Sequence, residues 1–175
     1  MTGKEFFKRI ANGKVDFLQD FLELLKKEKL PFCVIGGLAV NAYAEPVVSL
    51  DLDVIVAVPK LERLLSRLPK KWPVKEFPNS LNISAPRSDL RIQIQTDPRY
   101  QPFVSRAVRK NILGYRMPVA RIEDVLQGKI WSATDKTRRP SKRQKDLADI
   151  LRLVEVKSDL QSLVPDPLRS ELFPS

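Results

Sequence analysis

Two glycines and two aspartates in the segment FCVIGGLAVNAYAEPVVSLDLDVIVAV, residues 32–58, have the types and spacing that phosphate chemistry requires. Asp51 and Asp53 alternate with apolar residues, so in a strand their side chains point to one face from Cα atoms about 7 Å apart. Carboxylates about 5 Å apart repel by roughly 3 kcal/mol at an effective dielectric constant near 20. A hard cation offsets this repulsion, because Mg²⁺ (or Mn²⁺) binds carboxylate oxygens and shares its remaining positions with phosphates. The spacing therefore predicts a metal site at Asp51 and Asp53.

The glycine pair adds a predicted site for phosphate groups. Gly36 and Gly37 follow a short apolar run, as in a strand that turns into the start of a helix. Such a turn presents backbone N–H groups to phosphate oxygens, and glycines let a polyphosphate approach the backbone. Alone, a Gly-Gly pair is also typical of an ordinary turn, and Asp-x-Asp of a solvent-facing strand end. Neither the Walker sequence nor G-x-G-x-x-G is present, which excludes a P-loop and a dinucleotide fingerprint.

The elements that must position these residues form a mixed α/β half followed by a helical half. The predicted class is α/β (α+β), with a small mixed β-sheet core flanked by helices in residues 1–120 and a C-terminal helical region in residues 121–175. Capping-box spacings are present at Thr2/Glu5 and at Ser141/Gln144. Periodicity and turn residues predict strands at 32–35, 50–58, 81–84 and 90–95, a hairpin at 109–120, and helices at 2–13, 15–30, 38–44, 61–68, 121–134 and 141–155, with one short helix after residue 157.

Composition narrows the class of protein. The 175 residues include 31 Lys and Arg against 21 Asp and Glu, and the net charge of +10 favours polyanionic partners. A single cysteine and no histidine exclude a disulfide framework, the usual zinc sites and a Ser-His-Asp triad. No stretch approaches the ~20 apolar residues of a membrane span, so no membrane partner is predicted. A cytoplasmic location is the expectation.

A second group of charged residues lies in QGKIWSATDKTRRPSKRQKDLADILRL, residues 127–153. Lys129 falls on the apolar stripe of its predicted helix, which leaves two alternatives: a snorkelling lysine at the rim of the core, or a cation turned inward to a phosphate. Asp146 and Lys142 share another helix face with Asp149. The run KTRRPSKRQK is either a solvated loop or, beside a nucleotide site, a surface for an acceptor RNA through Arg138, Arg139 and Lys142.

The two groups together resemble known families. Gly36, Gly37, Asp51 and Asp53 match the Gly-Gly, short helix, Asp-x-Asp signature of the polymerase-beta-like nucleotidyltransferase superfamily. The segments RQKDLADI and IEDVLQGKIW are similar to elements of AbiEii-like nucleotidyltransferases, the toxin halves of abortive-infection systems. The resemblance implies a metal-dependent enzyme that moves NMP from an NTP to an acceptor hydroxyl, with RNA or tRNA as one acceptor class, and releases pyrophosphate. It also implies a cognate antitoxin as a partner.

The resemblance implies roles for individual residues. Asp51 and Asp53 would hold Mg²⁺, and Gly36 and Gly37 would bind the β- and γ-phosphates. Asp146 would orient Lys145 or the acceptor. The remaining implied nucleotide or charge-neutralising contacts are Ser49, Lys129, Arg143 and Lys145.

Two features depart from the family pattern. Val47 and Ser49 stand where the family often has Arg-x-Thr. The superfamily usually places a third acid on a later strand, but the polar face of the predicted strand 90–95 carries Arg91, Gln93 and Gln95. Asp97 is the predicted substitute, and a site with two carboxylates and a glutamine is the alternative. The competing functions are therefore a catalytically weakened RNA-binding or toxin–antitoxin regulatory protein, and a structural subunit of a toxin–antitoxin pair.

Overall fold

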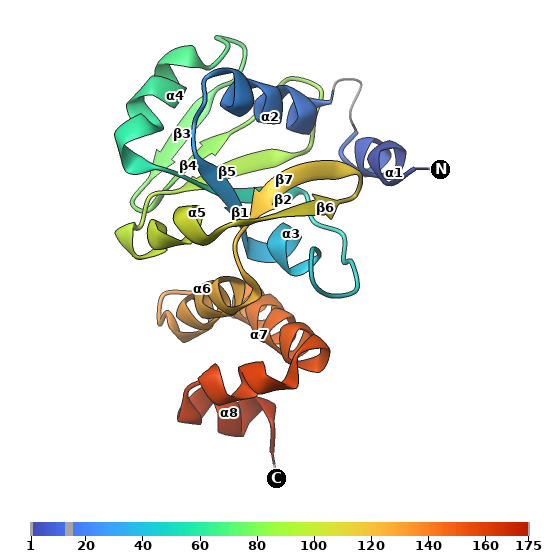
Figure 1. Ribbon diagram of the computed structural model, residues 1–175, viewed down its shortest axis with the longest axis vertical. Coiled ribbons are helices and arrows are strands. Elements are labelled where there is room, and N and C mark those ends of the chain that lie inside the picture. Colours follow the sequence, from blue (N-terminus) through green and yellow to red (C-terminus); the bar gives the residue numbers. More distant parts are fainter. Residues whose placement is uncertain (1, 13–15, 175) are drawn as a thin grey trace.

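A mixed β-sheet forms the centre of the computed structural model, which describes residues 2–12 and 16–174 (Figure 1). Within these residues the sheet has seven strands: β1 (Phe32–Ile35), β2 (Asp51–Val56), β3 (Val74–Phe77), β4 (Ser80–Ile83), β5 (Arg91–Gln95), β6 (Val108–Ile112) and β7 (Tyr115–Val119). Their order is β3-β4-β5-β2-β1-β7-β6. β2 therefore lies in the middle, antiparallel to β1 and parallel to β5.

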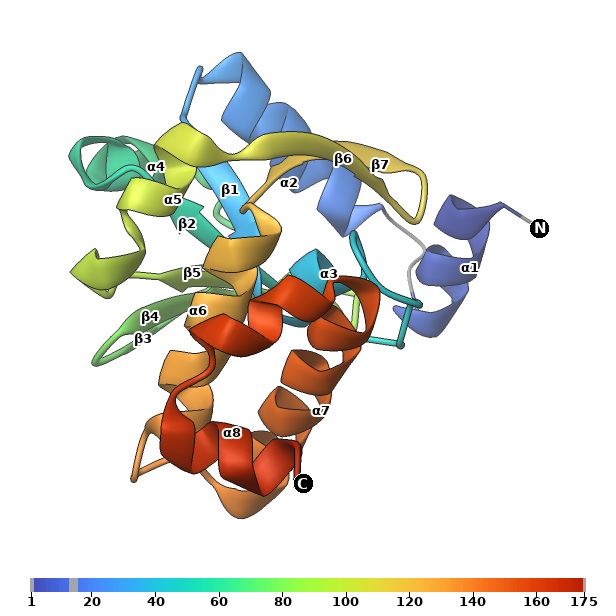
Figure 2. The ribbon, with the colours of Figure 1, turned by 60° about the horizontal axis from the view of Figure 1, so that its bottom comes forward.

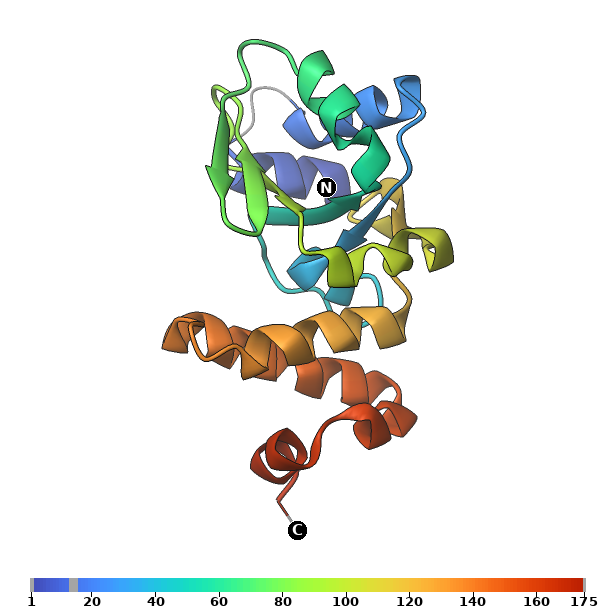
Figure 3. The same cartoon turned by 90° about the vertical axis from the view of Figure 1, so that its left-hand side faces the viewer.

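Helices cover both faces of this sheet. They are α1 (Gly3–Ile10), α2 (Phe17–Lys27), α3 (Gly36–Val40), α4 (Leu61–Arg67), α5 (Pro102–Arg106), α6 (Ile122–Thr134), α7 (Pro140–Val156) and α8 (Asp166–Leu172). Short 3₁₀ helices lie at Val58–Lys60, Pro98–Tyr100 and Ser158–Leu163. α2 and α4 pack on one face, and α3 and α6 on the other, with α7 and α8 stacked beyond α6 (Figure 3). Figure 2 shows α6, α7 and α8 grouped at one end of the molecule.

The predicted fold class is confirmed: a mixed sheet is flanked by helices and followed by a helical C-terminal part. The capping box at Thr2 and Glu5 is present, with Glu5 N donating to Thr2 Oγ1 at 3.2 Å and Thr2 N to Glu5 Oε2 at 2.7 Å. The predicted hairpin around Gly114 is β6–β7. The helix predicted from Val15 starts at Phe17 among the described residues, and Val15 itself lies outside them.

One strand was missed and two local predictions were wrong. The strand β3 was missed because all its side chains are exposed, which removes the burial alternation that marks a strand. Helix α3 begins at Gly36 itself and ends at Val40, so the glycines form its first residues rather than a separate turn. No side chain caps α7 at Ser141, because the helix starts at Pro140, whose fixed φ suits the first helical position.

The middle of β2 is buried between its neighbours, as its continuous apolar run predicted. Leu52, Val54 and Ile55 are 0% exposed, whereas Asp51 and Asp53 at its start are partly exposed. The face of β2 that carries Leu52 and Val54 is therefore buried along its length, whereas the face that carries Asp51 and Asp53 is partly exposed at these two residues. Among the described residues, none of the helices has both the length and the apolar character of a membrane span.

Candidate active site

Strand register places Asp53 at the meeting point of three elements. Asp53 is opposite Ile35, the last residue of β1, and beside Gln93 on β5. Gly36, the first residue of α3, follows Ile35 directly. Its φ is +68°, in the left-handed region, and a Cβ at this position would overlap the Asp53 carboxylate. The glycine is therefore required both by the backbone conformation and by contact with the acid.

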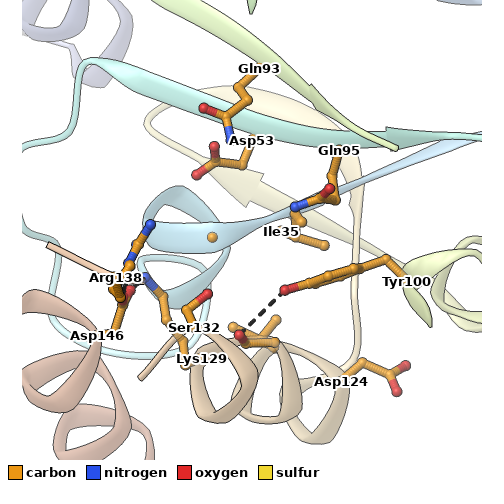
Figure 4. Close-up of a pocket in the computed structure, with 13 residues that line it drawn as sticks. Ile35, Asp53, Gln93, Gln95, Tyr100, Asp124, Lys129, Ser132, Arg138 and Asp146 are labelled. Atoms are coloured by element: carbon orange, nitrogen blue, oxygen red, sulfur yellow. Dashed lines mark hydrogen bonds and ion pairs between the residues drawn. The ribbon is translucent and has the colours of Figure 1, made fainter. Parts of the chain in front are cut away.

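A cavity of about 100 Å³ opens at this point. Asp53 and Gln93 form one wall, and Lys129, Arg138 and Asp146 face them from the helical side (Figure 4). A wider cavity of about 580 Å³ adjoins it, and five residues line both cavities: Gln93, Gln95, Tyr100, Ser132 and Arg138. The two cavities therefore share part of their walls.

Asp53 carries a carboxylate that pairs with none of the described residues. It makes no hydrogen bond or ion pair with any residue in 2–12 or 16–174. Its pKa is raised from 3.8 to about 6, mainly because burial disfavours the charged form; the Lys129 cation opposes this rise, and the Asp51 carboxylate adds to it. An acid in this setting needs either a proton or a cation.

Asp51 differs, because its carboxylate is already paired. Arg91, its register neighbour on β5, donates to Oδ1 at 2.6 Å, and Lys142 Nζ lies 3.7 Å from Oδ2. Ser49 Oγ donates to the backbone oxygen of Asp51 at 3.1 Å and accepts from its N–H at 3.3 Å. Ser49 thus shapes the start of β2.

Lys129 is turned inward, as in one of the two alternatives left open by the sequence, but it meets carboxylates, and its contact with a phosphate stays a prediction. Its side chain is 11% exposed, and Nζ lies 3.0 Å from Asp146 Oδ1 and 2.7 Å from Asp149 Oδ2, both on α7. Burial would lower the pKa of Lys129, but the two carboxylates outweigh it and raise that pKa. Lys129 on α6 is therefore bound by two carboxylates of α7, and these ion pairs hold the two helices together.

The same network extends in two directions. Asp146, only 1% exposed, also accepts from Arg138 at 2.8 Å, which places the Arg138 guanidinium at the cavity. Asp149 accepts from Arg152 at 2.6 Å. Arg152 in turn donates to Asn41 Oδ1 at 2.9 Å, beyond the end of α3. Hydrogen bonds thus link the charged side chains of α7 to the loop that precedes Asp51.

The described residues fit one divalent cation better than two. Asp51 and Asp53 share a face of β2, and Gln93 is the register neighbour of Asp53, so the oxygen ligands here are two carboxylates and one amide. These are oxygen ligands that Mg²⁺ accepts. A cation at Asp51 would compete with Arg91 and Lys142 for that carboxylate. Within residues 2–12 and 16–174 there is no group of three or more acid, cysteine or histidine side chains that could hold a metal. A cation would therefore complete its coordination with water or phosphate.

Several predicted site residues are not brought to the small cavity. Arg143 Nη1 and Nη2 pair with Glu171 on α8 at 3.0 and 2.7 Å, and Lys145 is exposed. Arg143 and Lys145 are the immediate neighbours of Lys142 and Asp146 on α7, and consecutive helical residues point about 100° apart. Asp97 borders the wider cavity, where Arg99 already binds it at 2.7 Å. The Arg99 hydrogen bond lowers the pKa of Asp97, so it is a poor base.

Other lining residues were not predicted. Tyr100 donates to the Gly128 carbonyl oxygen at 3.4 Å, and a Cβ at Gly128 would lie 3.1 Å from the Tyr100 ring. This contact joins residues 28 positions apart, and no local pattern marks it. Ser132 lies one turn of α6 beyond Gly128 and shares its helix face. Its helical spacing from Lys129 was the sequence signal that could have placed it near the site.

A pair of glycine substitutions tests the contact between Gly36 and Asp53. Gly36→Ala is expected to destabilise the fold by about 2 kcal/mol, because the left-handed φ and the displaced carboxylate both cost free energy. Gly37→Ala is the matched control, since its Cβ would meet only Ser49 Oγ at 3.8 Å. Thermal denaturation of both variants checks this. Equal stability of the two would contradict the close approach.

Comparisons with solved structures show a shared fold. The antibiotic-resistance factor ANT(2″)-Ia aligns with a TM-score of 0.59 at 13% identity over 88% of this chain and 90% of that one. The lincosamide antibiotic adenylyltransferase LnuA aligns at 0.56 and 13% identity, over 80% and 96%. An antigenic nucleotidyltransferase-like protein from Paracoccidioides brasiliensis aligns at 0.52 and 16%, over 89% and 84%. The comparison with curated protein sequences finds no match.

The fold is therefore shared with solved structures of nucleotidyltransferases, and in this chain Gly36 lies directly against Asp53. The sequence model of the nucleotidyl transferase AbiEii toxin family, of type IV toxin–antitoxin systems, matches residues 70–173. The chain belongs to this family, whose class of reaction is nucleotidyl transfer. The matched segment includes Gln93 and Lys129 and begins after the glycines and the Asp-x-Asp pair.

Proposed function

We propose that this protein transfers a nucleoside monophosphate from an NTP to an acceptor hydroxyl, with a divalent cation held by Asp51 and Asp53. The observation that carries the proposal is the Asp53 carboxylate, which has no partner among the described residues and faces a cavity with Lys129 and Arg138. Gly36 leaves room for this carboxylate against the backbone at the start of α3. The bound cation would activate the acceptor hydroxyl and stabilise the leaving pyrophosphate.

The chain's own residues would position the reactants. Gly36 and Gly37 would present backbone N–H groups to the β- and γ-phosphates, and Ser49 would orient the start of β2 for them. Arg138 lines both cavities and would neutralise phosphate charge. Lys129 would act mainly by holding Asp146 and Asp149 in place, because both carboxylates already occupy its ammonium group.

The net positive charge of the protein favours RNA, including tRNA, as the class of acceptor. Of the three predicted RNA contacts, Arg139 is exposed, whereas Arg138 pairs with Asp146 and Lys142 lies 3.7 Å from Asp51. The surface around Arg139 would therefore contact the acceptor backbone, and the other two cations would act nearer the phosphates. Family membership also supports a cognate antitoxin as a partner of the system.

A catalytically weakened protein is the second proposed function, because Gln93 stands beside Asp53 on the strand where a third acid is expected. Glutamine carries no charge and is a poor base. Arg91 also occupies the Asp51 carboxylate at 2.6 Å. Such a protein would bind an NTP with Mg²⁺ and transfer its nucleoside monophosphate slowly or not at all.

The two functions separate in one assay. Each labelled NTP is incubated with Mg²⁺ and total RNA, with and without the protein, and the RNA is resolved on a gel. The first function predicts Mg²⁺-dependent labelling by the unaltered protein, with little further gain in Gln93→Asp. The weakened form predicts NTP binding without labelling, and labelling restored in Gln93→Asp. Absence of both NTP binding and labelling would contradict both proposals.

A further inference from the structure

A large groove lies on the α2 side of the sheet, away from the candidate active site. It has a volume of about 1040 Å³, and most of its lining residues come from α2, the β6–β7 hairpin and the chain around the start of β1. It shares no lining residue with the two cavities near Asp53. Register also places the outward-facing residues of both hairpin strands on the same face, with Arg109 opposite Pro118 and Asn111 opposite Arg116.

The rim of this groove carries uncompensated positive charge. Glu23 is its single acid, and its carboxylate already accepts from Gln19 at 2.9 Å. Lys4 donates to the neutral Gln19 at 3.1 Å. None of the rim cations forms an ion pair within residues 2–12 and 16–174, whereas Arg91, Lys129 and Arg138 near the active site are all paired. The rim cations are Lys4, Lys26, Lys29, Arg109 and Arg116.

The wall between these cations is aliphatic. Leu22, Val104 and Pro118 are partly exposed in the groove, and Pro31 is exposed. Surfaces for single-stranded nucleic acid combine cations with aromatic rings that stack on bases, but Phe32 is the one aromatic ring in this lining. A phosphate backbone also has no apolar groups to bury against leucine and proline. A polypeptide with both carboxylates and apolar side chains matches the whole groove.

We propose that this groove binds an acidic, amphipathic segment of a partner protein. Its apolar side chains would lie against Leu22, Val104 and Pro118, and its carboxylates would pair with the lysines and arginines of the rim. The binding does not depend on the nucleotidyl-transfer site, because the two share no residue. Charge complementarity of this kind mainly raises the association rate and falls with salt.

Peptide selection tests the proposal without knowledge of the partner. Short random peptides displayed on phage are selected on the full-length protein and depleted on a Lys26→Glu/Arg116→Glu variant, which reverses one charge on each wall. The enriched peptides are expected to be acidic and to contain apolar residues. Fluorescence anisotropy with a synthetic selected peptide should show affinity falling by about tenfold or more in that variant, and also in Leu22→Ser.

The control variant is Lys60→Glu/Lys70→Glu, which changes the net charge equally at two exposed lysines outside the groove. It should bind the peptide like the unaltered protein, and circular dichroism should show all variants folded. An equal loss of affinity in this control would overturn the proposal, since attraction would then be unspecific. Failure to enrich any peptide would also overturn it. Oligouridine that binds more tightly than the peptide, and loses affinity in Lys26→Glu/Arg116→Glu, would instead make the groove a nucleic-acid site.

Discussion

Asp53→Asn is expected to abolish nucleotidyl transfer and at the same time to stabilise the metal-free protein at neutral pH. Transfer is lost because the amide cannot hold a divalent cation with Asp51. Stability rises because the wild-type carboxylate is partly buried without a partner, and burial raises its pKa from 3.8 to about 6. After allowance for partial exposure, the gain should be about 2 kcal/mol.

The stability gained in Asp53→Asn should depend on pH, because it comes from the ionisation of Asp53. A carboxyl group with a raised pKa in the folded state binds its proton more tightly when folded, so its contribution to stability falls as pH rises from 3.8 to about 6. The difference between Asp53→Asn and the wild type should therefore be small below pH ~4 and complete above pH ~7. Urea denaturation across this range measures it. A constant difference at all pH values would show that ionisation of Asp53 is not the cause.

Addition of Mg²⁺ and substitution of a second acid, Asp97, serve as controls for this prediction. Mg²⁺ should stabilise the wild type at neutral pH and leave Asp53→Asn unchanged, because a ligand that binds the folded state raises its stability. Asp97→Asn is the matched acid variant: its carboxylate is held by Arg99, whose hydrogen bond lowers the pKa of Asp97. Near-normal transfer is expected from it. A loss as complete as that of Asp53→Asn would instead make Asp97 the third acid of the site.

Lys129→Met is expected to be the most destabilising substitution in the helical half, by about 3 kcal/mol. It leaves Asp146, which is 1% exposed, and the partly buried Asp149 without the ammonium group that joins them. Removal of one partner of a buried ion pair typically costs about 3–5 kcal/mol, and the remaining bonds to Arg138 and Arg152 reduce that cost here. Chemical denaturation measures the change.

Lys145→Met is the matched control on α7, because Lys145 is exposed and its loss should change stability by less than about 0.5 kcal/mol. A double variant, Lys129→Met with Asp149→Leu, should recover part of the loss, since a buried pair replaced by apolar groups is often neutral. If Lys129→Met were as stable as Lys145→Met, the inward position of Lys129 would be contradicted.

Local patterns were sufficient wherever the physical cause is local. Alternation predicted β2 and the shared face of Asp51 and Asp53, and the short strand before Gly36 was predicted with its observed bounds. The capping box at Thr2 depends on residues three positions apart and was also correct. The exposed β3 could not be predicted in this way, because an edge strand exposed along its whole length has no alternation to detect.

The placement of residues on helix α7 shows where motif spacing is insufficient. Resemblance assigned Arg143 and Lys145 to the site together with Asp146. Consecutive helical residues point about 100° apart, so all three cannot face one cavity. Packing of α7 against α6 and α3 turns Asp146 and Asp149 inward and leaves Arg143 to pair with Glu171 on α8.

The sequence by itself determined the class of fold, the glycine and aspartate pairs and the buried centre of β2, because strand and helix periods are set by neighbouring residues. The tertiary structure alone decided which distant residues meet. Parallel pairing of β2 with β5 puts Gln93 beside Asp53, and the packing of α6 on α7 brings Lys129 to Asp146 across 17 positions. Such contacts depend on the register and packing of whole elements around one core, and no local pattern specifies them.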